Sequence, residues 1–217
     1  MDEIERSKRI LKILNHIYPK TPIPLKHINK FTLLISVLLS AQCTDVNVNN
    51  VTKNIYPKYN TPEHFVKLGR KKIEKLIKSI GIFRVKAKSV YFLSKQLIEK
   101  HDGKVPKSFE ELEKLPGVGH KTASVVMSQG FGFSAFPVDT HIHRLAQRWG
   151  LTNGKNVTQT EKDLKRLFPK NAWNKLHLQI IYYGREFCTA RSCYGITCKI
   201  CSTCYPARKK MVKTKKA

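Results

Sequence analysis

Apolar residues recur along this chain at intervals of three and four, the spacing that places side chains on one face of an α-helix. Near the amino terminus they are Ile4, Ile10, Leu14 and Ile17, and Pro19 ends the pattern. Alternating strand-like patterns are hard to find. The pattern therefore predicts an all-α protein of about ten short helices.

Helix-start signals support this interpretation. Thr61–Glu63 places a capping residue before a proline at the first helical position. Ser108–Glu111 and Thr158–Glu161 both fit the capping-box pattern. The segment Lys30–Cys43 is apolar on all sides of its helical surface, which predicts a buried core helix.

The chain of 217 residues carries a net charge of +26, from 41 Lys and Arg against 15 Asp and Glu. Such an excess favours a polyanionic partner, with nucleic acid the first candidate class and an anionic membrane surface the second. Residues 66–100 hold eleven Lys or Arg and two Glu in a predicted helix–turn–helix around Gly81. We expect this segment to present a phosphate-facing surface.

Secretion and membrane signals are not recognisable. The longest apolar run, Phe31–Ala41, is too short to span a bilayer, and the first nine residues lack the apolar core of a signal peptide. We therefore expect a soluble, intracellular protein; with nucleic acid as the favoured polyanion, a location on nucleic acid rather than at a membrane is expected. The basic segment Arg208–Ala217 is expected to be disordered and to contact polyanions nonspecifically.

A glycine-rich motif, LPGVGHKTA, occupies Leu115–Ala123. The two glycines that flank Val118 permit a tight turn between helices with positive φ, and the valine can anchor the turn in the core. Such a turn exposes backbone N–H groups at the start of the second helix, where they can bind phosphate. A helical turn without chemical consequence is the alternative.

Lys121 falls in the first turn of that second helix, where the helix dipole opposes a positive charge. The dipole and partial burial would favour the neutral amine needed for nucleophilic attack, whereas a solvated lysine is the alternative. Asp139 precedes an apolar-periodic stretch and is a predicted N-cap whose carboxylate can stabilise positive charge or accept a proton. His141 and His143 do not face one another on a helix, so we interpret them as packing or DNA-contact residues.

Five of the six cysteines lie within residues 188–204, in the pattern C-x4-C-x4-C-x2-C-x2-C. Their clustering indicates a metal site rather than disulfides. The closely spaced run, closed by a more distant cysteine, suits a [4Fe-4S] cluster better than a zinc ribbon, which usually has two separated C-x2-C knuckles. Zinc and free or redox-active thiols are the alternatives.

These residues carry a family resemblance. The motif at 115–123 and the sequence VDTH at 138–141 resemble endonuclease III of the helix-hairpin-helix DNA glycosylase superfamily. Further matches are Leu38–Asp45, Ile80–Ala87 and Tyr183–Arg185, so the resemblance extends over nearly the whole chain.

The resemblance implies two helical lobes. The first is a helical barrel domain, residues 23–133, which contains the helix-hairpin-helix at about 112–131. The second is an iron-sulfur cluster domain built from residues 1–22 and 134–204. A basic tail, residues 205–217, follows it.

The resemblance also implies a bifunctional DNA N-glycosylase that removes oxidised pyrimidines and cleaves abasic sites by β-elimination. Lys121 falls on the family's Schiff-base lysine and Asp139 on its catalytic aspartate, while Gln42 and Ile82 fall near its duplex-probing positions. The implied partner is double-stranded DNA with damaged pyrimidines or abasic sites, bound by a monomer. The other expected DNA contacts are Gly117, Val118, Gly119, His120, Thr122 and His141, with His120 replacing the family's usual Arg.

Endonuclease III carries a [4Fe-4S] cluster on C-x6-C-x2-C-x5-C, and this chain departs from that spacing. Alignment of the central C-x2-C assigns the ligands as Cys188, Cys198, Cys201 and Cys204. Cys193 is then left over, and its exchange for Cys188 stays open.

Two other functions stay open. An adenine-mismatch glycosylase of the same fold would lack a lysine at the position of Lys121. A noncatalytic DNA-binding module held by a metal cluster would leave both Lys121 and Asp139 unexplained.

Overall fold

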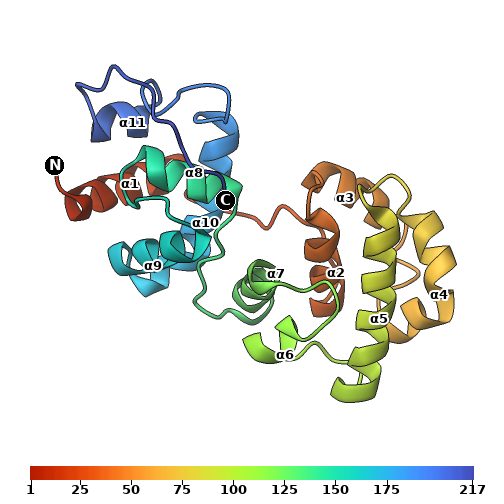
Figure 1. The fold of residues 1–217 in the computed structure, drawn as a ribbon. Coiled ribbons are helices and arrows are strands. Elements are labelled where there is room, and N and C mark those ends of the chain that lie inside the picture. The colour runs from red at the N-terminus through yellow and green to blue at the C-terminus, as the bar shows by residue number, and fades with distance from the viewer. The chain divides into compact units, whose positions relative to one another are not determined.

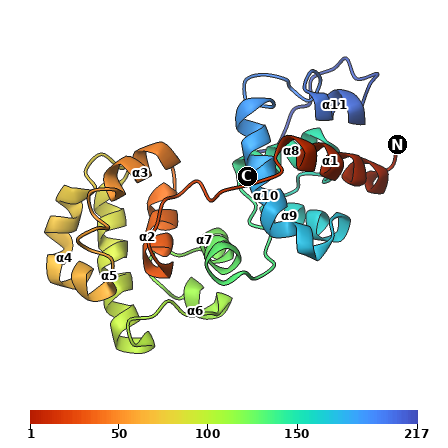
Figure 2. The same ribbon diagram turned by 180° about the vertical axis from the view of Figure 1, so that it is seen from behind.

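The computed structural model describes residues 1–217, and all of its regular elements are helical (Figures 1 and 2). The all-α prediction is confirmed. By its internal contacts the chain divides into two compact units. Residues 23–133 form one, here called the hairpin unit, and residues 1–22 with 134–217 form the other, the cysteine unit. A search for a helix with the length and apolarity to cross a membrane finds none.

The hairpin unit is built mainly from helices that pack around one hydrophobic core. The elements are α2 (Lys30–Ser40), α3 (Asp45–Thr52), α4 (Pro62–Leu76), α5 (Phe83–His101), α6 (Phe109–Glu113), α7 (His120–Val125) and the π-helix η1 (Val126–Gly130). The predicted caps of α4 and α6 are confirmed, because Thr61 and Ser108 accept hydrogen bonds from the third residue of each helix.

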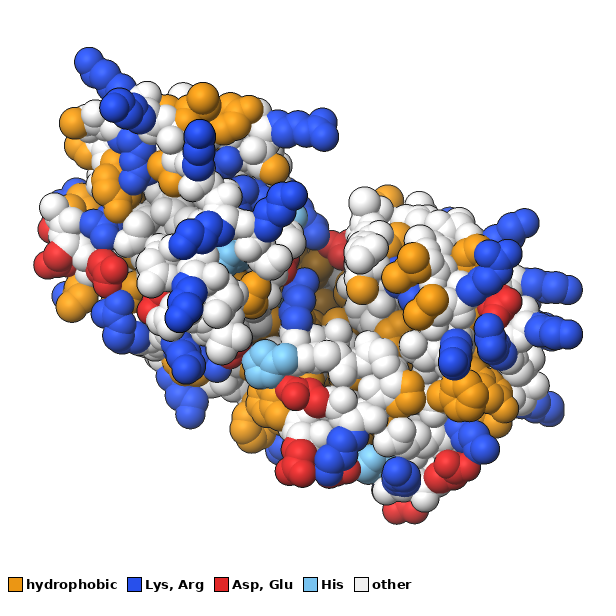
Figure 3. All heavy atoms as spheres, viewed as in Figure 1, with side chains coloured by type: hydrophobic (Ala, Val, Ile, Leu, Met, Phe, Trp, Pro, Cys, Tyr) orange, Lys and Arg blue, Asp and Glu red, His pale blue; other side chains and the backbone are white.

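The basic segment 66–100 forms most of α4 and α5, which lie side by side (Figure 1). Their inner faces are apolar, and ten of the eleven basic residues are exposed. Lys and Arg side chains gather over this part of the unit (Figure 3). Lys86 is the exception, because it lies on the inner face of α5 and is buried.

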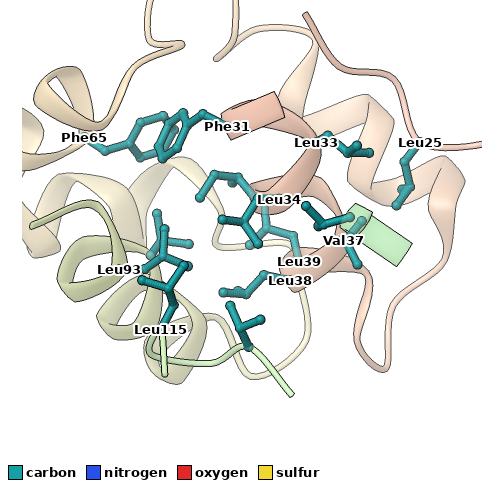
Figure 4. Packing of buried hydrophobic residues seen from close by; sticks show 14 of the residues in the cluster. Leu25, Phe31, Leu33, Leu34, Val37, Leu38, Leu39, Phe65, Leu93 and Leu115 are labelled. Atoms are coloured by element: carbon teal, nitrogen blue, oxygen red, sulfur yellow. The ribbon is translucent and has the colours of Figure 1, made fainter. Parts of the chain in front are cut away.

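Helix α2 is the buried core helix that the sequence predicts. Its residues from Phe31 to Leu39 are all buried, which explains why no polar face interrupts the apolar run. Phe31 packs edge-on against Phe65 of α4, with ring centroids 5.5 Å apart (Figure 4). The helix ends at Ser40 rather than at the expected Cys43.

The cysteine unit has its own core, in which Trp149 and Tyr183 meet edge-on at 5.8 Å. The expected capping box at Thr158–Glu161 is wrong: Asn156 caps the helix instead and accepts a hydrogen bond from the Gln159 amide at 2.7 Å. The elements of this unit are α1 (Glu3–Ile17), α8 (Thr140–Arg148), α9 (Val157–Leu167), the 3-10 helix η2 (Lys170–Ala172), α10 (Trp173–Glu186) and α11 (Lys199–Cys204).

The basic tail is ordered, in contrast to the disorder expected from its composition. The Val212 amide donates to the Tyr194 carbonyl at 2.9 Å. Gln147 of α8 exchanges two hydrogen bonds with the backbone of Lys215, at 2.8 and 3.1 Å. These backbone hydrogen bonds, which charge composition does not reveal, hold the tail along the cysteine unit.

The two glycines of the hairpin turn should respond differently to substitution. Gly117 has φ +79°, and an added Cβ would lie 2.8 Å from Ser89 Cβ and 3.1 Å from Leu38 Cδ1. Gly117→Ala should therefore lower the free energy of unfolding by about 2–4 kcal/mol. Gly119→Ala should cost less than about 1 kcal/mol, because its φ is −97° and no protein atom lies near the new Cβ. Urea unfolding measures both, and equal losses would contradict this account of the turn.

Candidate functional site

The turn between α6 and α7 is anchored from within the protein. Val118 is buried, and its amide donates to the Leu115 carbonyl at 3.0 Å. Of the two glycines only Gly117 has a positive φ, whereas Gly119 is the extended N-cap of α7. The expected turn with a positive φ is found, and Gly117 is the residue that supplies it.

The start of α7 is open to approach from outside. Its N-cap, Gly119, has no side chain that could bind the first amides of the helix, and a Cβ built there meets no atom within 4 Å. Neither backbone strain nor internal packing thus requires glycine at this position. A ligand that comes close to the backbone would require it.

The first residues of α7 display their side chains at the surface. His120 Nδ1 lies 2.8 Å from Glu113 Oε1 of α6, and its ring stacks on Phe109 at 6.3 Å. Lys121 is exposed and Thr122 is half-buried. The partial burial expected of Lys121 is not found, because α7 turns Ala123 and Ser124 toward the core instead. The geometry does place Lys121 in the first turn of α7, as expected.

Asp139 is the N-cap of α8, as the sequence predicts. Its Oδ1 accepts a hydrogen bond from the Ile142 amide at 2.8 Å, so the helix start fixes the carboxylate. His141 is half-buried, with Nδ1 3.4 Å from Arg144 Nη2. His143 is buried, its Nδ1 lies 2.8 Å from Thr160 Oγ1, and burial lowers its pKa. The two histidines thus have separate surroundings, and His143 is a packing residue.

Three exposed residues of the hairpin unit other than glycine have left-handed backbone conformations: Gln42, Ile82 and Asp102, the last of which is the C-cap of α5. Gln42, just after α2, has φ +54°, and Ile82, just before α5, has φ +51°. The Ile82 side chain is 53% exposed. Left-handed conformations are strained for residues other than glycine and are concentrated at functional sites.

Five buried cysteines line the segment after α10. The sulfur atoms of Cys188, Cys193, Cys198 and Cys201 all lie within 4.8 Å of one another. Cys204 is buried in the same core but is not one of these four. The structure thus brings three of the expected ligands together with Cys193.

Arg148 of α8 organises the loop around these thiols. It is buried, and its Nη1 donates to Cys188 Sγ at 3.2 Å and to the carbonyls of Thr189 and Ser192 at 2.7 and 3.2 Å. Cys193 itself has φ +63°. Hydrogen bonding with Cys198 and burial raise the pKa of Cys188, while hydrogen bonds with Cys201 and Arg148 act in the opposite direction. Binding a metal here would release protons from the thiols.

The chemistry of this donor set fits a sulfur-binding metal centre. Four thiols converge in a buried place, and the nearby guanidinium can stabilise their thiolate form. Soft thiolate ligands of this kind select iron–sulfur clusters or zinc.

Sequence reasoning did not identify Arg148 as a residue of the thiol site, and it did not predict that Lys86 is buried. Both residues continue an apolar stripe: Lys86 precedes Val90 and Leu93 on the buried face of α5, and Arg148 follows Leu145 on α8. A charged residue at a buried position of a helical stripe is the signal that could have identified them.

Comparisons with known proteins agree with these features. The family model described as HhH-GPD superfamily base excision DNA repair protein matches residues 35–170. Endonuclease III of Bacillus subtilis (strain 168) is 42% identical over 198 residues, which cover 91% of this chain and 90% of that protein. Endonuclease III of Escherichia coli (strain K12) is 41% identical over 191 residues, or 87% of this chain and 90% of that protein.

Solved structures give the same result. A trapped endonuclease III–DNA covalent intermediate is similar with a TM-score of 0.85 at 41% identity, over 88% of this chain and 91% of that one. A non-covalent endonuclease III–DNA complex has a TM-score of 0.86 at 39% identity, over 94% and 98% of the two chains. The chain therefore belongs to the endonuclease III family of DNA glycosylases and abasic-site lyases, within the HhH-GPD superfamily of base excision DNA repair proteins.

Proposed function

We propose that this protein removes oxidised pyrimidines from double-stranded DNA as a bifunctional glycosylase, with Lys121 as nucleophile and Asp139 as the stabilising carboxylate. It acts as a monomer. The observation that carries the proposal is the placement of Lys121 in the first turn of α7, directly after an anchored turn whose outer surface is open. An amine at that place can reach a sugar while the adjacent backbone binds a phosphate.

The hairpin supplies the phosphate contact. Gly117 gives the turn its shape, Val118 holds it in the core, and Gly119 leaves room for the DNA backbone. The dipole of α7 favours an anion at its start, and His120 and Thr122 flank the lysine. Such contacts position the enzyme without reading the sequence. The charge of +26 supplies the remaining, salt-dependent attraction.

The damaged nucleotide has to leave the duplex before Lys121 can attack its sugar, and a weakly paired lesion leaves the stack more readily. Gln42 and Ile82 are suited to occupy the space that it vacates. Ile82 offers an exposed apolar side chain and Gln42 an amide that can hydrogen-bond to a base. Both residues are exposed, and both lie at the end of a helix. His141, next to the Asp139 cap, is a further proposed DNA contact.

The chemistry then follows from two side chains. The neutral Lys121 amine attacks C1′, and the bond from C1′ to the base breaks. The Asp139 carboxylate stabilises positive charge on the sugar and accepts a proton from the amine. The C1′–O4′ bond then breaks and O4′ takes up a proton, so that the sugar ring opens and the amine becomes a Schiff base with C1′. The Schiff base acidifies the 2′ proton. Loss of that proton expels the 3′ phosphate and cleaves the strand.

The cysteine unit is proposed to hold a [4Fe-4S] cluster on Cys188, Cys193, Cys198 and Cys201. The grouping of their sulfur atoms supports this set over the set with Cys204 that alignment suggests. When bound, the cluster supplies a rigid cross-link for the loop rather than a step of the reaction. Arg148 contributes to the same purpose by binding the carbonyls of that loop.

Substitution of the two proposed catalytic residues should separate their roles. Lys121→Gln should abolish the borohydride-trapped adduct with abasic DNA, because the amine is lost, and should leave duplex affinity nearly unchanged. Asp139→Asn keeps an oxygen to cap α8 and should fold normally, yet base excision should fall by about 100-fold or more.

On DNA that already contains an abasic site, Asp139→Asn should retain more strand cleavage than Lys121→Gln, since its amine survives. An unchanged rate of trapping in Lys121→Gln would place the nucleophile elsewhere. If the wild-type protein bound duplex DNA but formed no adduct, the noncatalytic alternative would be correct.

Single cysteine substitutions should identify the ligands. Anaerobically purified protein should contain about four irons per chain. Cys193→Ala should lose iron and visible colour, whereas Cys204→Ala should keep both. Cys43→Ala, which lies in the hairpin unit, is the control for the loss of a thiol. Retention of iron in Cys193→Ala with loss in Cys204→Ala would restore the ligand set from alignment, and stoichiometric zinc without iron would exclude the cluster.

A further inference from the structure

Lys86 is a buried lysine on a helix that otherwise exposes its basic residues. It is 3% exposed, while Arg84 and Lys88 on the same helix are exposed. Removal from water disfavours the charged form and lowers the pKa of this lysine. An aliphatic side chain would occupy the same position without that penalty. The ammonium therefore needs an explanation beyond packing.

The ammonium binds the carboxyl end of α2. Its Nζ donates to the Leu39 carbonyl at 2.9 Å and to the Ala41 carbonyl at 2.6 Å. Carbonyls at the end of a helix have no partner within the helix, and the dipole makes that end negative. Lys86 thus caps α2 from a different helix, at the residue that directly precedes Gln42.

The backbone of Lys86 also contacts the loop that contains Ile82. Its amide donates to the Ile82 carbonyl at 3.1 Å. One residue therefore contacts the chain beside Gln42 through its ammonium and Ile82 through its backbone. The two loops also approach closely, since a Cβ on Gly81 would lie 3.5 Å from the Gln42 carbonyl oxygen.

Asn47 of α3 adds a second connection. Its Nδ2 donates to the Ser79 carbonyl at 3.0 Å and to Cys43 Sγ at 3.3 Å, so it joins the same two loops. Left-handed conformations of residues other than glycine cost about 1 kcal/mol or more each, and they persist where surrounding contacts determine them. Lys86 and Asn47 provide such contacts.

We infer that Lys86 is a positioning residue, which fixes the loops of Gln42 and Ile82 so that both side chains are preset to enter the duplex as the damaged nucleotide leaves. This inference rests on the proposed function of these two residues. Without the ammonium, the end of α2 would relax, and extrusion of a paired base would require ordering the loops at the same time. The reaction rate on substrates that need no unpairing should not depend on Lys86.

The test compares Lys86→Met with Lys88→Met. Both substitutions remove one positive charge from α5, but only Lys86 binds α2. Single-turnover excision of an oxidised pyrimidine from fully paired DNA should fall about 10- to 100-fold in Lys86→Met. Cleavage of an abasic site in single-stranded DNA should stay near the wild-type rate. Lys88→Met should change the rates on both substrates by the same small factor, because it removes a phosphate-facing charge but no contact with α2.

A second readout requires no chemistry. In a Lys121→Gln background, 2-aminopurine next to a stable abasic analogue reports base unstacking on binding. Lys86→Met should reduce the fluorescence increase at saturating protein, and Lys88→Met should not. A wild-type protein that excised no oxidised pyrimidine would contradict the proposed substrate class. If Lys86→Met and Lys88→Met still differed in fluorescence in that case, the role inferred for Lys86 would stand.

Equal losses in Lys86→Met and Lys88→Met would overturn the inference, because they would reduce Lys86 to one charge among many. Equal losses on paired and single-stranded substrates would also overturn it, since they indicate general destabilisation. Should Lys86→Met fail to fold, Asn47→Ala removes the second connection between the loops and must show the same selectivity for paired DNA. An Asn47→Ala protein without that selectivity would contradict the inference.

Discussion

The hairpin unit depends on the complete burial of α2. Because its residues from Phe31 to Leu39 are buried on every side, the surrounding elements are placed by contact with one helix. Leu38 comes within 3.1 Å of the Cβ position of Gly117, which fixes the hairpin turn, and the end of α2 is held by Lys86. Burial of each leucine contributes about 1.5–3 kcal/mol, so the hairpin turn and the loop after α2 are both attached to a strongly stabilised helix.

The cysteine unit brings thiols and basic residues together in its core, and its cysteines form no disulfides. Arg148 binds several carbonyls of the loop after α10 and one thiol, and the tail adds a backbone hydrogen bond from the Val212 amide to the Tyr194 carbonyl of the same loop. These contacts fix the loop that carries the thiols from two sides.

Sequence reasoning succeeded where one local rule determined the outcome. Periodicity and turn chemistry predict the buried helix that begins at Lys30, the caps at Thr61, Ser108 and Asp139, and the turn anchored by Val118. The family itself followed from motifs that the comparisons confirm.

Sequence reasoning failed where contacts between distant parts of the chain determine the position of a residue. Lys86 was counted with the phosphate-facing residues, although contact with α2 buries it. Lys121 was expected to be partly buried, yet the core takes other residues of α7. Cys193 was left over because spacing alone cannot show which sulfur atoms converge. The tail looked disordered, since composition does not reveal its hydrogen bonds with Tyr194 and Gln147.

The proposed reaction requires the exposed Lys121 at the start of α7 to form a covalent bond with the sugar of a damaged nucleotide. Peptide mapping by mass spectrometry of the borohydride-trapped protein–DNA adduct tests it most directly. The account predicts that the sugar remnant is attached to Lys121 in the peptide that contains the hairpin. A remnant attached to another lysine or to the amino terminus would contradict it.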